Sequence, residues 1–156
     1  MVKVGGSNPL PADKIFKMKD FKNFQIRWKE PLGLKESPYL YRWSFFIFGY
    51  SLRIHHWIKS DDRRYFHDHS CDLISIVVKG EYTNVTPNGS FFVKAPSIWK
   101  AKATKQHYLD IPKKGAWTIL LCSRPYHKWG FYVNNHKWRP LRYFSKFGVI
   151  QYKNYQ

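Results

Sequence analysis

Two histidines one residue apart, in the stretch FHDHSCDLISIVVKGEY (residues 66–82), have the residue types and spacing of a metal site. Successive side chains of a strand point to opposite faces, so His67 and His69 would lie on one face, about 6–7 Å apart along the backbone. Asp72 would face the other side unless the chain turns at Ser70-Cys71. Neutral imidazole and carboxylate suit Fe, Mn, Ni or Zn as divalent ions. The stretch therefore indicates a divalent transition metal site, with Asp72 as a ligand or as a catalytic base.

The elements that would position these side chains are short strands. From residue 37 onward, segments rich in aromatic and β-branched residues alternate with turn signals such as Pro87-Asn88-Gly89. They predict strands over residues 40–48, 50–58, 65–69, 73–79, 81–86, 90–94, 97–101, 107–111, 116–122 and 130–133. No helical stretch lies between these segments, which excludes a parallel βαβ arrangement and favours a β-sandwich or barrel.

The N-terminal part has a different texture. Residues 1–36 are rich in lysine and proline, and DKIFKMKDFKNF (residues 13–24) has the apolar spacing of a short helix. We expect two units: a basic N-terminal extension over residues 1–36, helical or irregular, that packs on the barrel, and a single all-β barrel domain over residues 37–156.

Composition bounds the class of protein. The 156 residues correspond to one ordinary domain, and 44% of them are hydrophobic, which is enough for a core. No apolar run approaches the roughly 18 residues of a membrane helix, and the N-terminus does not resemble a signal peptide. We therefore expect a cytoplasmic protein that does not bind membranes. Cys71 and Cys122 are expected to be reduced thiols.

The charge balance indicates anionic partners. Lys and Arg number 27 against 10 Asp and Glu, a formal net charge of +17. A nucleic-acid surface and a merely solvated basic surface fit this distribution about equally well, because the cations are spread along the chain.

The stretch HDHSCDLISIVVKGE resembles the first motif of the cupin superfamily, His-x-His, a short spacer, Glu, an apolar strand and Gly, with Asp72 at the position of the usual Glu. Pro96-Ser97-Ile98 stands where the second motif has its turn, and His107 stands at the position of that motif's histidine. Lys102 and Thr104 replace the usual Pro and Gly. Segments PYLYRW, SDDRRYFHDHS and WGFY, within residues 38–144, are similar to small bacterial and phage cupin-like proteins.

The resemblance implies a double-stranded β-helix (jelly roll) in which His67, His69 and His107 hold the metal, with Asp72 as a fourth ligand or with water instead. Side chains at the mouth of such a barrel would then meet the substrate. Four residues are candidates for binding a small anionic ligand: Arg64, Tyr65, Arg124 and His55. The alternative for Arg64 is an ion pair with Asp61 or Asp62 in an exposed loop.

Three functions fit this pattern. A metal-dependent enzyme of oxygenase or isomerase type, acting on a small anionic molecule, is the first. The second is a non-catalytic binding protein that captures a nucleotide-like anion or grips nucleic acid through its basic aromatic surface. A metal-free epimerase-like protein with a His/Asp dyad is the third. Homodimerisation through edge strands is also possible. Phosphate-binding loops, zinc-protease motifs and serine-hydrolase motifs are absent from the sequence.

Overall fold

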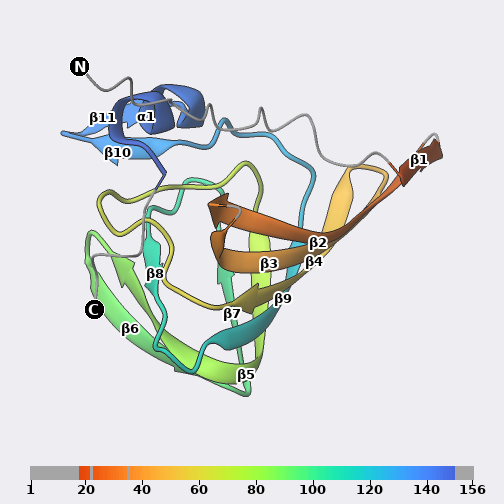
Figure 1. The fold of residues 1–156 in the computed structure, drawn as a ribbon, viewed down its shortest axis with the longest axis horizontal. Coiled ribbons are helices and arrows are strands. Elements are labelled where there is room, and N and C mark those ends of the chain that lie inside the picture. The colour runs from red at the N-terminus through yellow and green to blue at the C-terminus, as the bar shows by residue number, and fades with distance from the viewer. Residues whose placement is uncertain (1–17, 22, 35, 150–156) are drawn as a thin grey trace.

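The computed structural model describes residues 18–21, 23–34 and 36–149. They form eleven strands and one short helix (Figure 1). In chain order the strands are β1 (Met18–Phe21), β2 (Phe24–Leu34), β3 (Ser37–Ile47), β4 (Tyr50–Trp57), β5 (Leu73–Thr86), β6 (Gly89–Lys94), β7 (Ser97–Ala101), β8 (Tyr108–Asp110), β9 (Ala116–Cys122), β10 (Phe131–Val133) and β11 (His136–Trp138). The helix α1 spans Pro140–Phe147. None of the described helices is long and apolar enough to cross a membrane.

The strands pair antiparallel in a jelly-roll arrangement. Their order is β1-β2-β3-β4-β9-β5-β6, and β7 and β8 also pair with β5. β5 belongs to both halves of the barrel, because its first part pairs with β9 and β7 and its second part with β6 and β8. Gly80 lies where the two parts meet, with a φ of 81°, and a Cβ there would come 2.3 Å from the carbonyl oxygen of Gly115. Only glycine fits this crossing of the chain.

The N-terminal strands correct one expectation. The helix predicted over residues 13–24 is absent from its described part, since residues 18–21 and Phe24 are in strands. β1 pairs with β2, and β2 pairs with β3 along nearly its whole length. Ladder hydrogen bonds and sheet packing thus override a weak local helical spacing. The expected boundary between residues 36 and 37 falls in the turn between β2 and β3.

The predicted strands are otherwise largely confirmed, with two differences. Residues 73–79 and 81–86 are one continuous strand through Gly80, and residues 65–69 make only isolated bridges, at His67. The main core lies inside the barrel, where Val77, Tyr82 and Leu40 are at most 2% exposed. The apolar core thus encloses the middle of β5.

A small C-terminal unit closes one end of the fold (top of Figure 1). Tyr143 of α1 is fully buried, and its ring stacks on Phe131 of β10 with centroids 3.8 Å apart. Arg64 donates hydrogen bonds to the carbonyl oxygens of Phe147 and Gly148, at 2.6 and 2.7 Å. The loop before β5, which carries the histidines, is therefore tied to the end of α1.

Candidate metal centre

Three imidazoles converge at one end of the barrel. The possible ligand atoms of His67, His69 and His107 all lie within 4.8 Å of one another. The Nε2 atoms of His69 and His107 are 2.7 Å apart, and the ring of His67 lies 5.3 Å and 5.1 Å from the other two rings, centroid to centroid. The structure thus brings together the three histidines that the sequence selects.

Backbone pairing places these side chains. His67 and His107 form an antiparallel bridge in which each backbone N–H donates to the other's carbonyl oxygen, at 3.0 and 2.9 Å. The backbone N–H of His69 donates to the carbonyl oxygen of Ala103 at 2.9 Å. The side chains of residues 67–69 therefore point to alternate faces, as in a strand, although residues 65–69 form no continuous strand.

Asp68 lies between His67 and His69 in the chain, and its side chain points to the opposite face. It is fully buried and its carboxylate points away from the barrel. It accepts hydrogen bonds from four groups on the C-terminal unit: the backbone N of Gly130, the hydroxyl of Tyr132, Nζ of Lys137 and Nε2 of His127. Although burial favours the neutral acid, these hydrogen bonds hold the pKa of Asp68 below its ordinary value. The carboxylate therefore anchors the histidine segment from behind.

Burial keeps the three imidazoles neutral. It lowers the pKa of His67 to about 4 and that of His69 to about 3. The pKa of His107 also lies well below its ordinary value, first through burial and then through the two neighbouring histidines. Neutral imidazole is the form that binds metal ions. At neutral pH the three imidazoles are therefore uncharged and able to bind a metal ion.

Asn84 fixes the orientation of His107. Its Oδ1 atom lies 3.0 Å from Nδ1 of His107, and both side chains are buried. Because an amide oxygen only accepts, Nδ1 of His107 carries the proton and Nε2 presents its lone pair to the cluster. An outer hydrogen bond of this kind is what orients metal-binding histidines. In the sequence, the only weak indication of this role is that Asn84 is a polar residue within a predicted strand.

Asp72 is not part of the cluster, which corrects the expectation of a fourth ligand or catalytic base. Its Oδ1 accepts hydrogen bonds from the backbone N of Ala103 and the hydroxyl of Tyr126, and its Oδ2 accepts one from Nζ of Lys102 at 2.9 Å. These bonds, led by that of Lys102, lower its pKa to about 2. The backbone does bend at Ser70 and Cys71, but Cys71 and Leu73 are both buried, so Asp72 between them faces away from the barrel interior.

A different carboxylate lies beside the cluster. Oδ2 of Asp61 is 3.8 Å from Nε2 of His67, and its Oδ1 accepts a hydrogen bond from the backbone N of Leu109 at 2.9 Å. Asp61 is only 6% exposed, and burial raises its pKa well above the ordinary value. The sequence places it in an exposed loop, because SDDRR is polar throughout; in the structure the loop folds inward against β8.

The residues expected to bind an anionic substrate lie elsewhere. Arg64 forms an ion pair with buried Asp62 at 2.7 Å and donates hydrogen bonds to the carbonyl oxygens at the C-terminal end of α1. Tyr65 packs on Tyr143 and Phe147. Arg124 donates to the carbonyl oxygen of Phe48 and lies over the ring of Tyr50 on the surface. These three side chains hold elements together, and the structure does not bring them to the histidines.

His55 does lie on the inner face of the barrel. It is 7% exposed, and neither of its ring nitrogens has a hydrogen-bond partner among the described residues. Burial, and then the charges of Arg42 and Arg53, hold its pKa well below the ordinary value. The prediction that one histidine of the His55-His56 pair points inward is confirmed by these burial values, since His56 stacks on Trp117 on the opposite face at 4.1 Å.

Arg53 is the cation that sequence reasoning missed. It belongs to the same strand as His55, two residues earlier, so both face the barrel interior. Its Nε donates to Oγ of Ser51 at 3.1 Å, and its guanidinium lies 5.8 Å from the ring of Phe46. It pairs with no acid among the described residues, and its charge acts on His69. Strand alternation in YSLRIHHW could have revealed it.

Comparison with known proteins shows the fold. No family model and no curated protein matches the sequence. An iron(II) form of HppE matches in structure with a TM-score of 0.51 and 9% identity, over 71% of this chain and 62% of the other. A cupin-2 domain-containing protein from Shewanella frigidimarina NCIMB 400 has a TM-score of 0.43 and 13% identity, over 64% and 83%. A cupin sugar phosphate isomerase from Silicibacter pomeroyi DSS-3 has 0.44 and 10%, over 58% and 64%.

The chain therefore shares its fold with the iron(II) form of HppE, and its antiparallel strand order is that of the jelly roll that the first histidine motif predicts. At 9% identity this likeness shows the fold and not the reaction. The chain spans less than two thirds of HppE and of the isomerase, so their activities describe those proteins alone.

Proposed function

We propose that this protein is a metal-dependent enzyme that acts on a small anionic molecule inside the barrel. The observation that carries the proposal is the cluster of three largely buried, neutral imidazoles, whose possible ligand atoms all lie within 4.8 Å of one another. Asp61 lies 3.8 Å from His67 but is not within that distance of all three histidines. Catalytic sites typically use three protein ligands and keep positions open, whereas structural sites are closed. A cluster of three histidines has the number of protein ligands that is typical of a catalytic site.

The residues fit a divalent transition metal ion. Two ligand atoms bound to one ion at about 2.1 Å are at most about 4.2 Å apart. The three histidines already lie within 4.8 Å of one another, so side-chain adjustments suffice. Asn84 holds His107 in the tautomer that a metal requires. When bound, such an ion would act as a Lewis acid toward a substrate or would activate dioxygen, which corresponds to an isomerase or an oxygenase type of reaction.

Arg53 gives the interior a site for the anion. Its neighbours on the inner face, Ser51 and His55, are polar, and among the described residues the guanidinium donates a side-chain hydrogen bond through Nε alone, to Ser51. The two terminal nitrogens can therefore donate to a carboxylate or a phosphate, the geometry that guanidinium groups favour. A substrate held by Arg53 would lie toward the His69 side of the cluster, since the positive charge of Arg53 contributes to the lowered pKa of His69. The net charge of +17 would raise the local concentration of anions.

The test is a titration of the untagged protein with Co(II), followed by oxalate as a small dianionic probe. We expect visible absorption bands of histidine-bound Co(II) at one ion per chain, and a shift of those bands when oxalate is added. Fe(II) is the first ion to test for turnover, since a similar fold is known with iron(II). Co(II) bands that oxalate leaves unchanged would contradict an open site, and the absence of any bands would contradict the metal.

A further inference from the structure

The acidic residues of the chain end at Asp110. Residues 111–156 contain six lysines and three arginines but neither Asp nor Glu. The described part of this segment forms β9 and the C-terminal unit of β10, β11 and α1. Asp62 and Asp68, which bind Tyr143 and Lys137 of this unit, are both buried. The unit therefore presents a basic surface, and such a charge asymmetry along a chain indicates a polyanionic partner.

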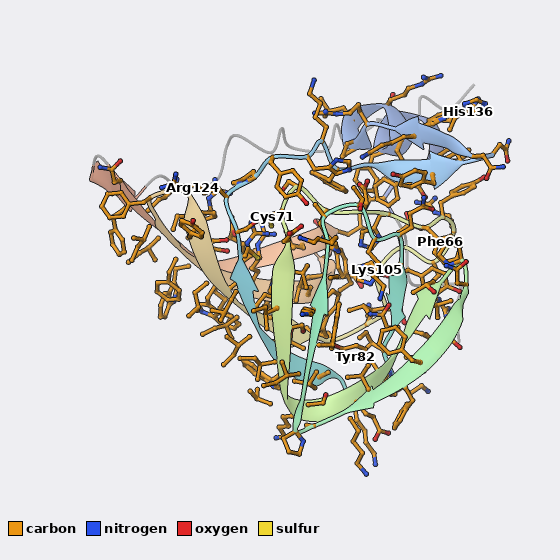
Figure 2. All side chains as sticks on the ribbon, turned by 180° about the vertical axis from the view of Figure 1, so that it is seen from behind. Phe66, Cys71, Tyr82, Lys105, Arg124 and His136 are labelled. Atoms are coloured by element: carbon orange, nitrogen blue, oxygen red, sulfur yellow. The ribbon has the colours of Figure 1, made fainter. Side chains whose placement is uncertain are left out.

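Helix α1 has one aromatic side and one basic side. Tyr143 is fully buried, and the ring of Phe147 packs on it with centroids 5.1 Å apart. Arg142, Ser145 and Lys146 have the spacing i, i+3 and i+4, so they lie together on the helix surface, and all three are exposed. Figure 2 shows this end of the molecule from behind, near the label of His136, with side chains that end in nitrogen projecting outward. The helix is thus anchored through its rings and presents its cations to solvent.

An open groove lies along the basic side of α1. It has a volume of about 380 Å³ and is lined by Trp138 of β11 together with Arg142, Ser145 and Lys146. The guanidinium of Arg142 lies over the indole ring of Trp138, 4.2 Å from its centroid. The indole in turn packs on Phe147, with centroids 5.6 Å apart. A ring fixed to the core of the unit therefore supports the guanidinium at the edge of the groove.

The groove combines two kinds of contact. Among the described residues, neither Arg142 nor Lys146 pairs with an acid, so both cations and the hydroxyl of Ser145 can donate to phosphate oxygens. Indole rings and guanidinium planes also stack on nucleobases, a contact that needs bases free of a double helix. A phosphate-rich chain with unpaired bases satisfies both kinds of contact at once.

We propose that the groove formed by Trp138, Arg142, Ser145 and Lys146 binds single-stranded nucleic acid. Charge complementarity supports this occupant, because the net charge of +17 attracts a polyanion and residues 111–156 add no carboxylate that would repel it. The groove shares no residue with the three histidines, so the proposal does not rest on the metal centre. It gives the protein a binding surface in addition to the proposed site in the barrel.

The experiment measures the fluorescence anisotropy of a labelled oligothymidylate of about 16 nucleotides, titrated with the full chain between about 50 and about 200 mM KCl. The double variant Arg142→Glu/Lys146→Glu reverses both charges of the groove. Lys94→Glu/Lys100→Glu is the matched control, because it reverses two exposed lysines on β6 and β7. Arg142→Lys keeps the charge and removes the planar guanidinium. Circular dichroism and the unfolding temperature check that each variant is folded.

We expect the groove double variant to bind the oligonucleotide at least about 30-fold more weakly, and its salt slope to be smaller in magnitude by about 1.4, since two phosphate contacts are lost. The control double variant should bind within about threefold of the original, because distant charges act only through the general field. Arg142→Lys should bind about 5–10-fold more weakly through the loss of stacking.

Three outcomes would overturn the proposal. The first is no binding of the oligonucleotide at about 50 mM KCl, where phosphate contacts are strong. The second is an equal loss in the two double variants, which would assign the affinity to net charge alone. The third is an unchanged affinity in Arg142→Lys together with equal competition by polyphosphate of the same charge, which would show that bases are not recognised.

Discussion

Oδ1 of Asn84 lies 3.0 Å from Nδ1 of His107, and both residues are buried. This hydrogen bond joins the C-terminal part of β5 to the histidine that precedes β8. Nε2 of His107 is therefore unprotonated, and it lies 2.7 Å from Nε2 of His69. The geometry makes Asn84 a positioning residue for the metal centre, because the tautomer of His107 depends on its acceptor.

Replacing Asn84 by Ala should therefore weaken metal binding by about 10–100-fold, the usual cost of losing an outer hydrogen bond to a metal-binding histidine. Asn84→Asp keeps an acceptor at the same place and should restore most of the affinity. Competition between the protein and a colorimetric chelator for Zn(II) measures both. Equal affinities in Asn84→Ala and in the unaltered protein, with both folded, would show that the bond does not orient the ligand.

Asp72 should be dispensable for metal binding, contrary to the expectation from the sequence motif. Its carboxylate is engaged by Lys102, Ala103 and Tyr126, outside the cluster. Asp72→Asn should bind Zn(II) with unchanged stoichiometry and with an affinity within about threefold of the original. A variant that loses its metal while keeping its fold would return Asp72 to the ligand set.

The same carboxylate predicts a pH dependence of stability. Its pKa falls from the ordinary value of 3.8 to about 2 in the folded protein, led by the hydrogen bond from Lys102. The ionised form therefore stabilises the fold above pH 4, and this contribution disappears as the pH falls through 2. The midpoint of urea unfolding should differ between the protein and Asp72→Asn at pH 5, and the difference should shrink by pH 2. A difference that is constant over this range would contradict the assigned hydrogen bonds.

Arg53 should bind the anionic group of a ligand. Charge-assisted hydrogen bonds contribute about 1.5–3 kcal/mol each, so Arg53→Ala should weaken oxalate binding to the Co(II) protein by about 10–100-fold. The control is Arg124→Ala, which removes an arginine from the surface at the β3–β4 turn. If the two variants lose affinity equally, general charge rather than a specific site is responsible.

The sequence predicts the fold and the core of the site for identifiable reasons. Alternation in HDH places His67 and His69 on one face and Asp68 on the other, and this parity holds even though residues 65–69 make only isolated bridges. The apolar run after Asp72 is correctly predicted to be a strand, the first half of β5. Only alternate side chains are buried, however, because Leu73 and Val77 face the core while Ile74 and Val78 are exposed. These features depend on local period alone, which a single sequence carries.

Long-range features were missed because they depend on folding back of polar segments. Asp61 lies in a polar loop, and only the contact with Leu109 of β8 shows that it is buried. Arg64 forms the ion pair with Asp62 that the sequence offered as the alternative to a substrate ligand, but Asp62 is buried. The further partner of Arg64 is the end of α1, with Phe147 83 positions away. Asn84 and Arg53 sit at ordinary strand positions, and their roles follow from the residues that register brings opposite them.

The metal content of the purified protein decides whether His67, His69 and His107 bind an ion. The protein, purified without a histidine tag from medium supplied with Fe, Mn, Ni and Zn, should carry about one transition metal ion per chain in elemental analysis. The double variant His67→Ala/His69→Ala should be folded and should carry none, while a variant of the exposed His136, such as His136→Ala, should keep the ion. A protein that contains no metal after loading, or a double variant that keeps it, would contradict the central claim.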